Sequence, residues 1–84
     1  MKLSINQILL QAITMHKEGR LEEAEPIYRE ILKIEPKHPD ANHNLGILMI
    51  SINKSSEALP LFKVATEANP NIEMFWSSYG NALL

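Results

Sequence analysis

The 84-residue sequence contains no cysteine. That absence excludes disulfides, zinc–thiolate sites and a cysteine nucleophile, and it is typical of proteins from reducing compartments. A long apolar run is also missing, because no stretch approaches the roughly 20 apolar residues that a membrane-spanning helix needs. Near the N-terminus, polar residues interrupt the apolar positions that follow Lys2, unlike in a signal peptide. We therefore expect a soluble, cytoplasmic protein that does not enter a membrane.

The sequence has no strong excess of charge of either sign. Its formal net charge is −2, and its eight Lys and Arg residues are scattered along the chain. Without a basic face, neither nucleic acid nor an anionic membrane surface is an expected partner. A protein or peptide ligand, recognised by shape and local polarity, fits this balance better.

Recognisable catalytic chemistry is absent as well. The serines lack a G-x-S-x-G elbow, and no glycine-rich loop is present to hold a phosphate. His38 and His43 are five residues apart, which separates them on a helix, and His16 lies far from both. We therefore predict no catalytic residue, no cofactor and no metal site, so the segment is not expected to be an enzyme.

What the sequence does contain is an internal repeat with an offset of 34 residues. The repeated positions include small residues, prolines and aromatic residues, which indicates that one structural unit is stacked. The matching pairs are Ala24 and Ala58, Pro26 and Pro60, Tyr28 and Phe62, Pro36 and Pro70, and Gly46 and Gly80. One domain over residues 1–84 is predicted, with a first unit at about 5–38, a second at about 39–72 and a partial third at 73–84.

Apolar residues spaced three and four apart predict five helices. Ser4 and Gln7 form a capping-box pattern ahead of the first helix, at about residues 5–18, and Gly19 ends it. The second helix covers 21–34 and the third 39–52, with His38 as its cap. Ser55 or Ser56 is expected to cap the fourth helix, which ends near residue 68, and the fifth covers 72–84.

Short turns require these helices to pack as antiparallel neighbours. Ala12, Gly46 and Gly80 share one position in the first helix of each unit. We expect the partner helix to approach closely there, with Tyr28 and Phe62 filling the space beside the contact, because a glycine inside a helix otherwise lowers its stability.

The motifs that carry these positions are similar to those of the tetratricopeptide repeat family. They are Asn44-Leu45-Gly46, the run Trp76 to Gly80, the set Ala24, Tyr28 and Pro36, and the set Ala58, Phe62, Ala65 and Pro70. The resemblance implies an all-α fold of antiparallel helix-turn-helix pairs stacked as a right-handed α-superhelix. Asn42 departs from the pattern, which has an aromatic residue at that position.

A second, weaker similarity involves the run Glu22 to Leu32 and the run Pro36 to Ala41. These runs resemble the N-terminal arrays of larger bacterial proteins. In such proteins the repeats precede a glycosyltransferase of the O-linked N-acetylglucosamine type, a sulfotransferase or a methyltransferase region. No transferase residues are present here, so the resemblance implies no activity for this segment.

The family resemblance implies a concave wall, built from the first helix of each unit, that binds peptides or partner proteins. The wall positions are Asn6, Leu9, Ile13, His16, Lys17, Asp40, His43, Asn44, Ile47, Ile50, Ser51, Met74, Ser77, Ser78 and Asn81. Asn44 occupies the place where this family often holds a peptide backbone; it could equally bond a neighbouring helix. Leu9 and Ile13 stand where the family's carboxylate clamp needs a basic residue and an asparagine, so that clamp is not expected.

The leading hypothesis is therefore a protein–protein interaction module, as the N-terminal part of a larger protein. The alternatives are a self-associating scaffold element and the recognition region of a repeat-containing glycosyltransferase or sulfotransferase. Self-association is suggested by the apolar last helix, through which a homo-oligomer could form. Its predicted face comprises Phe75, Trp76, Tyr79 and Leu83.

Overall fold

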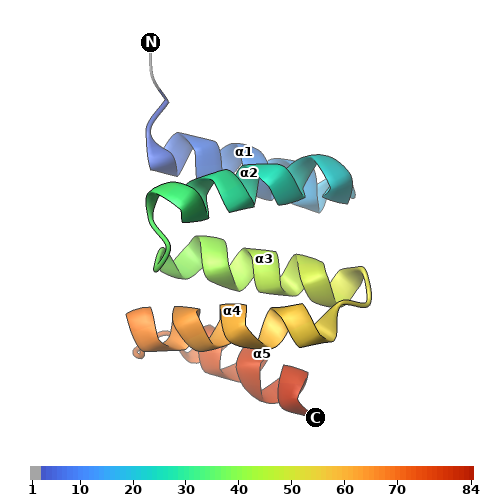
Figure 1. Ribbon diagram of the computed structural model, residues 1–84, viewed down its shortest axis with the longest axis vertical. Helices are drawn as coiled ribbons and strands as arrows, with labels where there is room; N and C mark the ends of the chain where they lie inside the picture. Colours follow the sequence, from blue (N-terminus) through green and yellow to red (C-terminus); the bar gives the residue numbers. More distant parts are fainter. Residues whose placement is uncertain (1–2) are drawn as a thin grey trace.

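The computed structural model describes residues 3–84. Within that range the chain forms five α-helices and no strand, so the predicted all-α class is confirmed. The helices are α1 (Ile5–Lys17), α2 (Leu21–Ile34), α3 (Pro39–Ser51), α4 (Ser55–Ala68) and α5 (Glu73–Leu83). Figure 1 shows them stacked along the longest dimension of the molecule, with the N-terminal and C-terminal helices at opposite ends.

Two of the predicted helix starts are confirmed. The Gln7 N–H donates to the Ser4 hydroxyl at 3.1 Å, and the Ser4 N–H donates to the Gln7 side chain at 2.8 Å, which completes the capping box of α1. At the start of α3, the Ala41 N–H donates to Nδ1 of His38 at 3.1 Å. Both caps satisfy backbone N–H groups that have no partner inside a helix.

The predicted cap of α4 is wrong. The helix begins at Ser55 itself, Lys54 takes the cap position, and no side chain bonds the free N–H groups there. Asn53 adopts a left-handed conformation with φ of 62°, which lets the chain reverse direction within two residues of the end of α3. Because the turn is this tight, Ser55 and Ser56 already belong to the first helical turn.

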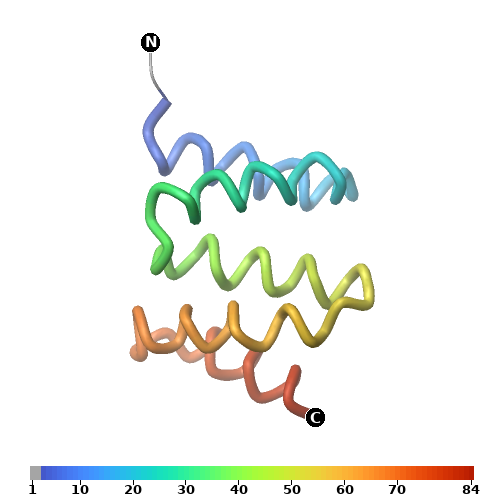
Figure 2. Tube along the Cα trace, viewed as in Figure 1, coloured from blue at the N-terminus to red at the C-terminus, as the bar shows by residue number. Residues whose placement is uncertain are grey.

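The helices form two hairpins, α1 with α2 and α3 with α4, and α5 packs against α4. The tube in Figure 2 shows the chain reversing at each connection, as short loops between neighbouring helices require. α2 joins the hairpins by packing on α3. The repeated sequence units are thus stacked in space, and each unit buries a face of its neighbour.

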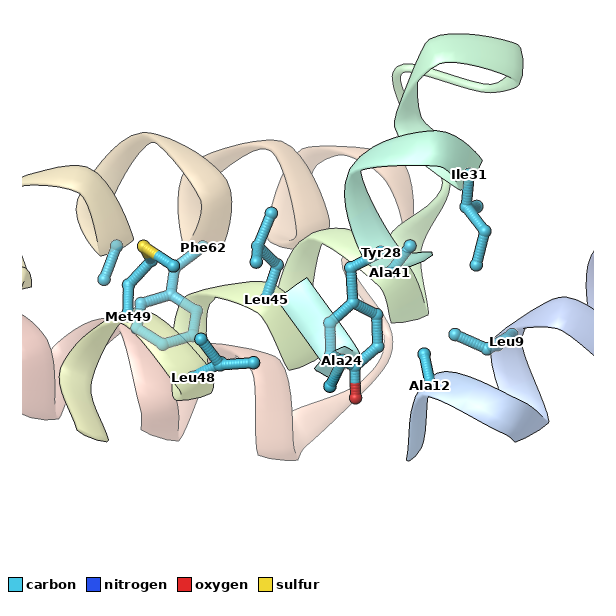
Figure 3. Packing of buried hydrophobic residues seen from close by; sticks show 11 residues of the cluster. Leu9, Ala12, Ala24, Tyr28, Ile31, Ala41, Leu45, Leu48, Met49 and Phe62 are labelled. Carbon is cyan, nitrogen blue, oxygen red and sulfur yellow. The ribbon is translucent and has the colours of Figure 1, made fainter. Parts of the chain in front are cut away.

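A single apolar cluster runs through both hairpins, from Leu9 and Ala12 on α1 to Phe62 on α4 (Figure 3). Tyr28 and Phe62, the two aromatic residues at equivalent positions, are essentially fully buried. The small residues Ala24 and Ala58 are fully buried as well. Alternation of small and large side chains at facing positions is what allows the helices to interlock.

The close approach predicted at the shared glycine position is found at Gly46. A Cβ atom added to this residue would lie 2.5 Å from Cε1 of Phe62, so any larger residue would have to displace the ring. At Gly80 the same expectation is wrong, because within residues 3–84 an added Cβ would meet nothing within 4 Å apart from its own stretch of helix. The described chain supplies no helix to cover that side of α5.

Candidate functional site

Most of the predicted wall residues have accessible side chains. Leu9 and His43 are the exceptions, because both are buried. These two residues lie 34 positions apart and therefore occupy the same place in successive units. The prediction that they face a ligand is corrected: in this structure the position belongs to the core.

Four of the predicted residues come together around one hollow between α3, α4 and α5. The hollow has a volume of about 180 Å³. It is several times larger than the roughly 30 Å³ that a water molecule occupies in the liquid, yet smaller than the roughly 300 Å³ at which small-molecule pockets begin. It therefore suits a single side chain rather than a cofactor. The lining residues are Ile47, Ile50, Phe62, Ser78, Asn81 and Ala82.

The hollow combines apolar walls with polar groups. Ile47 and Ile50 lie one helical turn apart on α3, and both side chains are partly exposed, at 36% and 38%. The buried ring of Phe62 contributes an aromatic surface from α4. Ser78 and Asn81 contribute a hydroxyl and an amide from α5. Such a site can take an apolar side chain while the polar groups bond a peptide backbone.

His43 fixes α5 against α3 beside this hollow. Its Nε2 lies 2.8 Å from the Ser78 hydroxyl, and its ring packs on Phe75 with centroids 4.7 Å apart and planes 30° apart. Burial lowers the pKa of His43, and the negative charge of Asp40 opposes that shift only partly. The neutral imidazole therefore holds Ser78 in place at neutral pH and is itself not free to contact a ligand.

His16 is also engaged within the protein. Its Nδ1 lies 3.0 Å from the Tyr28 hydroxyl, and the two rings meet edge to face. Burial lowers the pKa of His16, and burial raises the pKa of Tyr28 to about 12, so both side chains are neutral at pH 7. The pair joins α1 to α2. His16 therefore has a structural partner, although it was predicted to lie on the concave wall.

Asn44 retains hydrogen-bonding capacity. The structure shows no hydrogen bond from its side chain to another residue of 3–84, and no buried side-chain nitrogen or oxygen in that range lacks a partner. Its amide must therefore reach solvent. Of the two interpretations of Asn44, the bond to a neighbouring helix is not observed among residues 3–84, and the residue is half-buried.

The predicted self-association face is smaller than expected. Phe75 is buried against His43, and Tyr79 packs on the core. Trp76 and Leu83 remain exposed, and Nε1 of Trp76 donates to the Pro70 carbonyl at 2.8 Å. Phe75 and Tyr79 lie on the side of α5 that packs on the rest of the molecule, whereas Trp76 and Leu83 do not. The four predicted residues therefore do not share one exposed face.

Phe62 and Ala82 line the hollow, and the sequence did not indicate either as a site residue. Phe62 was interpreted only as filling space beside a close helix contact. It lines the hollow as well, because Gly46 has no side chain to move the ring away from α3. The expected contact between Phe62 and Gly46 is the feature of the sequence that could have indicated Phe62 as a site residue. Ala82 is one of many alanines, and no sequence pattern distinguishes it.

Asn42, which replaces an aromatic residue of the pattern, has a structural role. It is buried, and its Nδ2 donates to the carbonyls of Pro36 at 3.0 Å and His38 at 2.8 Å. These bonds tie α3 to the connection that precedes it. A larger hollow of about 520 Å³ lies along this connection, but five consecutive residues, 35–39, line it. It is the open side of a turn and not a site between helices.

Other kinds of site are not supported in the part of the chain that the structure describes. Residues 3–84 contain no group of three His, Cys, Asp or Glu side chains placed to hold a metal ion. Within the same range, every helix is too short or too polar to span a bilayer.

The family model described as tetratricopeptide repeat matches residues 15–78. The matched range runs from the last turn of α1 to the middle of α5, and it contains Ile47, Ile50, Phe62 and Ser78 of the hollow. The match covers well over half of the 84 residues.

Proposed function

Because the chain belongs to the tetratricopeptide repeat family, whose members generally mediate protein–protein interactions, we propose that it binds a peptide segment of a partner protein. The binding surface is the one presented by α1, α3 and α5. An apolar side chain of the ligand enters the hollow beside Ile47 and Ile50, and the ligand backbone bonds to amides such as those of Asn44 and Asn81.

The observation that carries this proposal is the convergence of predicted wall residues on one hollow. Ile47, Ile50, Ser78 and Asn81 come from two helices that are more than 20 residues apart in the sequence. Fully burying an isoleucine side chain stabilises a complex by about 1.5–3 kcal/mol, and because Ile47 and Ile50 are only 36% and 38% exposed, covering both contributes about 1–2 kcal/mol. A contact with Ile47 and Ile50 together therefore provides a useful share of a micromolar affinity, which corresponds to about 8 kcal/mol.

The experiment is a selection of peptides from a random library against the purified chain, followed by mapping with backbone amide chemical shifts. We expect the largest shift changes at Ile47, Ile50 and Asn81. Ile47→Ala should weaken the selected peptides about three- to fivefold, which is the loss of roughly 0.6–1 kcal/mol. Ile34 is the matched control, since it is an exposed isoleucine on α2 outside the hollow. Peptides that bind Ile47→Ala and the unaltered chain equally would contradict the groove assignment.

The proposal extends to the wider protein. We infer that this segment acts by binding alone, in the cytoplasm, and serves as the recognition region of a longer polypeptide, with a glycosyltransferase or sulfotransferase among the candidates. Support comes from the resemblance of residues 22–32 and 36–41 to such arrays. The purified 84-residue chain is then expected to transfer no sugar from a sugar nucleotide, and measurable transfer would contradict this part of the proposal.

A further inference from the structure

The five helices form two layers that differ in how closely their backbones approach. The backbone of α3 lies close to those of α1 and α5, whereas the backbones of α2 and α4 do not approach each other. A stack of repeats that is closer on one side curves toward that side. α1, α3 and α5 therefore form the inner, concave layer, and α2 and α4 form the outer layer.

Charge is distributed unevenly between these layers. The inner helices α1, α3 and α5 contain only one Asp, Glu, Lys or Arg each. On the outer helix α2, most of the exposed residues carry a charge. They are Glu22, Glu23, Arg29, Glu30 and Lys33.

The three charged residues of the inner layer lie at helix ends. Asp40 and Glu73 are in the first turns of α3 and α5, and Lys17 is the last residue of α1. An acid at the start of a helix and a base at its end stabilise the helix dipole, which accounts for these three charges without a ligand. Every ion pair within residues 3–84 involves α2, α4 or the connections between helices.

The lack of charge on the inner layer does not result from burial. Ile47, Ile50 and Ser51 on α3 are exposed, and so are Ser77 and Asn81 on α5. A ligand on this surface meets apolar side chains, hydroxyl groups and amides. An uncharged peptide backbone can form hydrogen bonds with these groups, whereas a charged side chain finds no counter-ion among them.

The hollow between α3, α4 and α5 has the same character. None of its lining residues is an Asp, Glu, Lys or Arg. Its volume of about 180 Å³ corresponds to about six water molecules, a space that a Leu, Ile or Met side chain can fill. A charge placed there would lose its hydration without gaining a partner, which is strongly unfavourable.

Resting on the function proposed above, we propose that the partner segment is uncharged. It has no Asp, Glu, Lys or Arg at the residues that contact α3 and α5, and one Leu, Ile or Met side chain anchors it in the hollow. Binding is driven by apolar burial and by neutral hydrogen bonds to Asn44 and Asn81. Segments recognised through a carboxylate, a phosphate or a run of basic residues form the competing class of ligand.

The first test is the composition of peptides selected from a random library on the purified chain. Peptides that shift the amide signals of Ile47, Ile50 and Asn81 are counted as groove ligands. We expect Leu, Ile or Met at one fixed position of these ligands, with Asp, Glu, Lys and Arg depleted from the neighbouring positions. A charged residue selected at a fixed position would overturn the proposal.

The second test changes the anchor residue of a selected peptide. Replacing the anchor by Asp should weaken binding at least about a hundredfold, because an unpaired carboxylate then enters the hollow. Exchange among Leu, Ile and Met should change the affinity by less than about threefold. The matched control adds Asp at a peptide end outside the contact and should bind like the unaltered peptide. An Asp anchor that binds within tenfold of the original would contradict an uncharged ligand.

The third test measures whether charge contributes to the affinity. Between about 50 mM and about 500 mM sodium chloride, the dissociation constant should rise by less than about threefold, because no charge pair is screened. Lys17→Gln and Glu73→Gln should also stay within threefold of the unaltered chain, since these charges serve the helix ends. A larger loss of affinity in salt or in either variant would show that the groove recognises charge.

Failure of the groove proposal and failure of this inference give different results. If no selected peptide shifts Ile47, Ile50 and Asn81, the groove itself is contradicted and this inference falls with it. If peptides map to the groove but require a charged residue or lose affinity in salt, the groove stands and the uncharged class of ligand is wrong.

Discussion

The two complete hairpins have the same register but use different chemistry at the same place. In the first, Tyr28 places its hydroxyl beside His16. In the second, the equivalent residues are Phe62 and Ile50, and neither can form such a bond. The first hairpin is thus joined by a polar pair. The second has a ring packed against a glycine, with isoleucines around a hollow. At one repeat position the first hairpin thus has a polar side-chain pair, and the second has an apolar contact beside a hollow.

The largest effect is expected from removing the ring of the second hairpin. Phe62→Ala leaves a cavity beside Gly46 and should lower the free energy of unfolding by about 3–5 kcal/mol. For a chain of this size that is most of the available stability. Far-ultraviolet circular dichroism with urea is the measurement. Retention of the original midpoint would show that the ring is not central to the second hairpin.

A smaller effect is expected at the polar pair of the first hairpin. Tyr28→Phe removes the hydroxyl and should cost about 0.5–1.5 kcal/mol, the usual contribution of one hydrogen bond. Adding His16→Ile gives the first hairpin the chemistry of the second. If the two side chains act as a pair, the double variant should lose less than the sum of the two single variants in urea unfolding. Strict additivity would contradict the coupling.

Acidification should weaken both hairpins moderately. Burial lowers the pKa values of His16 and His43 below the ordinary histidine value of about 6.5, so the unfolded chain binds protons that the folded chain does not. Stability is then fully present above pH 6.5 and falls as the pH drops below that value. The thermal midpoint should be lower at pH 5.5 than at pH 7.5, and His43→Gln should reduce the difference. A midpoint that rises on acidification would contradict this account.

The sequence predicted the helices well because their signals are local. The capping box at Ser4, the proline at position 39 and the apolar spacing depend on neighbours within one or two turns, and the structure has all of them. The offset of 34 residues then showed which two helices belong to one repeat unit and therefore form a pair.

Exposure was harder to predict because it depends on which helix lies across each residue. His43 and Phe75 were placed on separate binding surfaces, and the structure stacks them against each other. Gly80 was expected to resemble Gly46, which requires a covering helix that residues 3–84 do not supply. Repeat register identifies equivalent positions, but it does not show whether the neighbouring unit is present at each one.

The most direct test of this account compares alanine at two equivalent glycines. In urea unfolding under one set of conditions, Gly46→Ala should lower stability by about 1–3 kcal/mol, because its Cβ meets the Phe62 ring. Gly80→Ala should raise stability by up to about 1 kcal/mol, because helix propensity improves and nothing is displaced. Opposite signs are the predicted result. Equal changes of the same sign would contradict the claim that α3 is covered at this position and α5 is not.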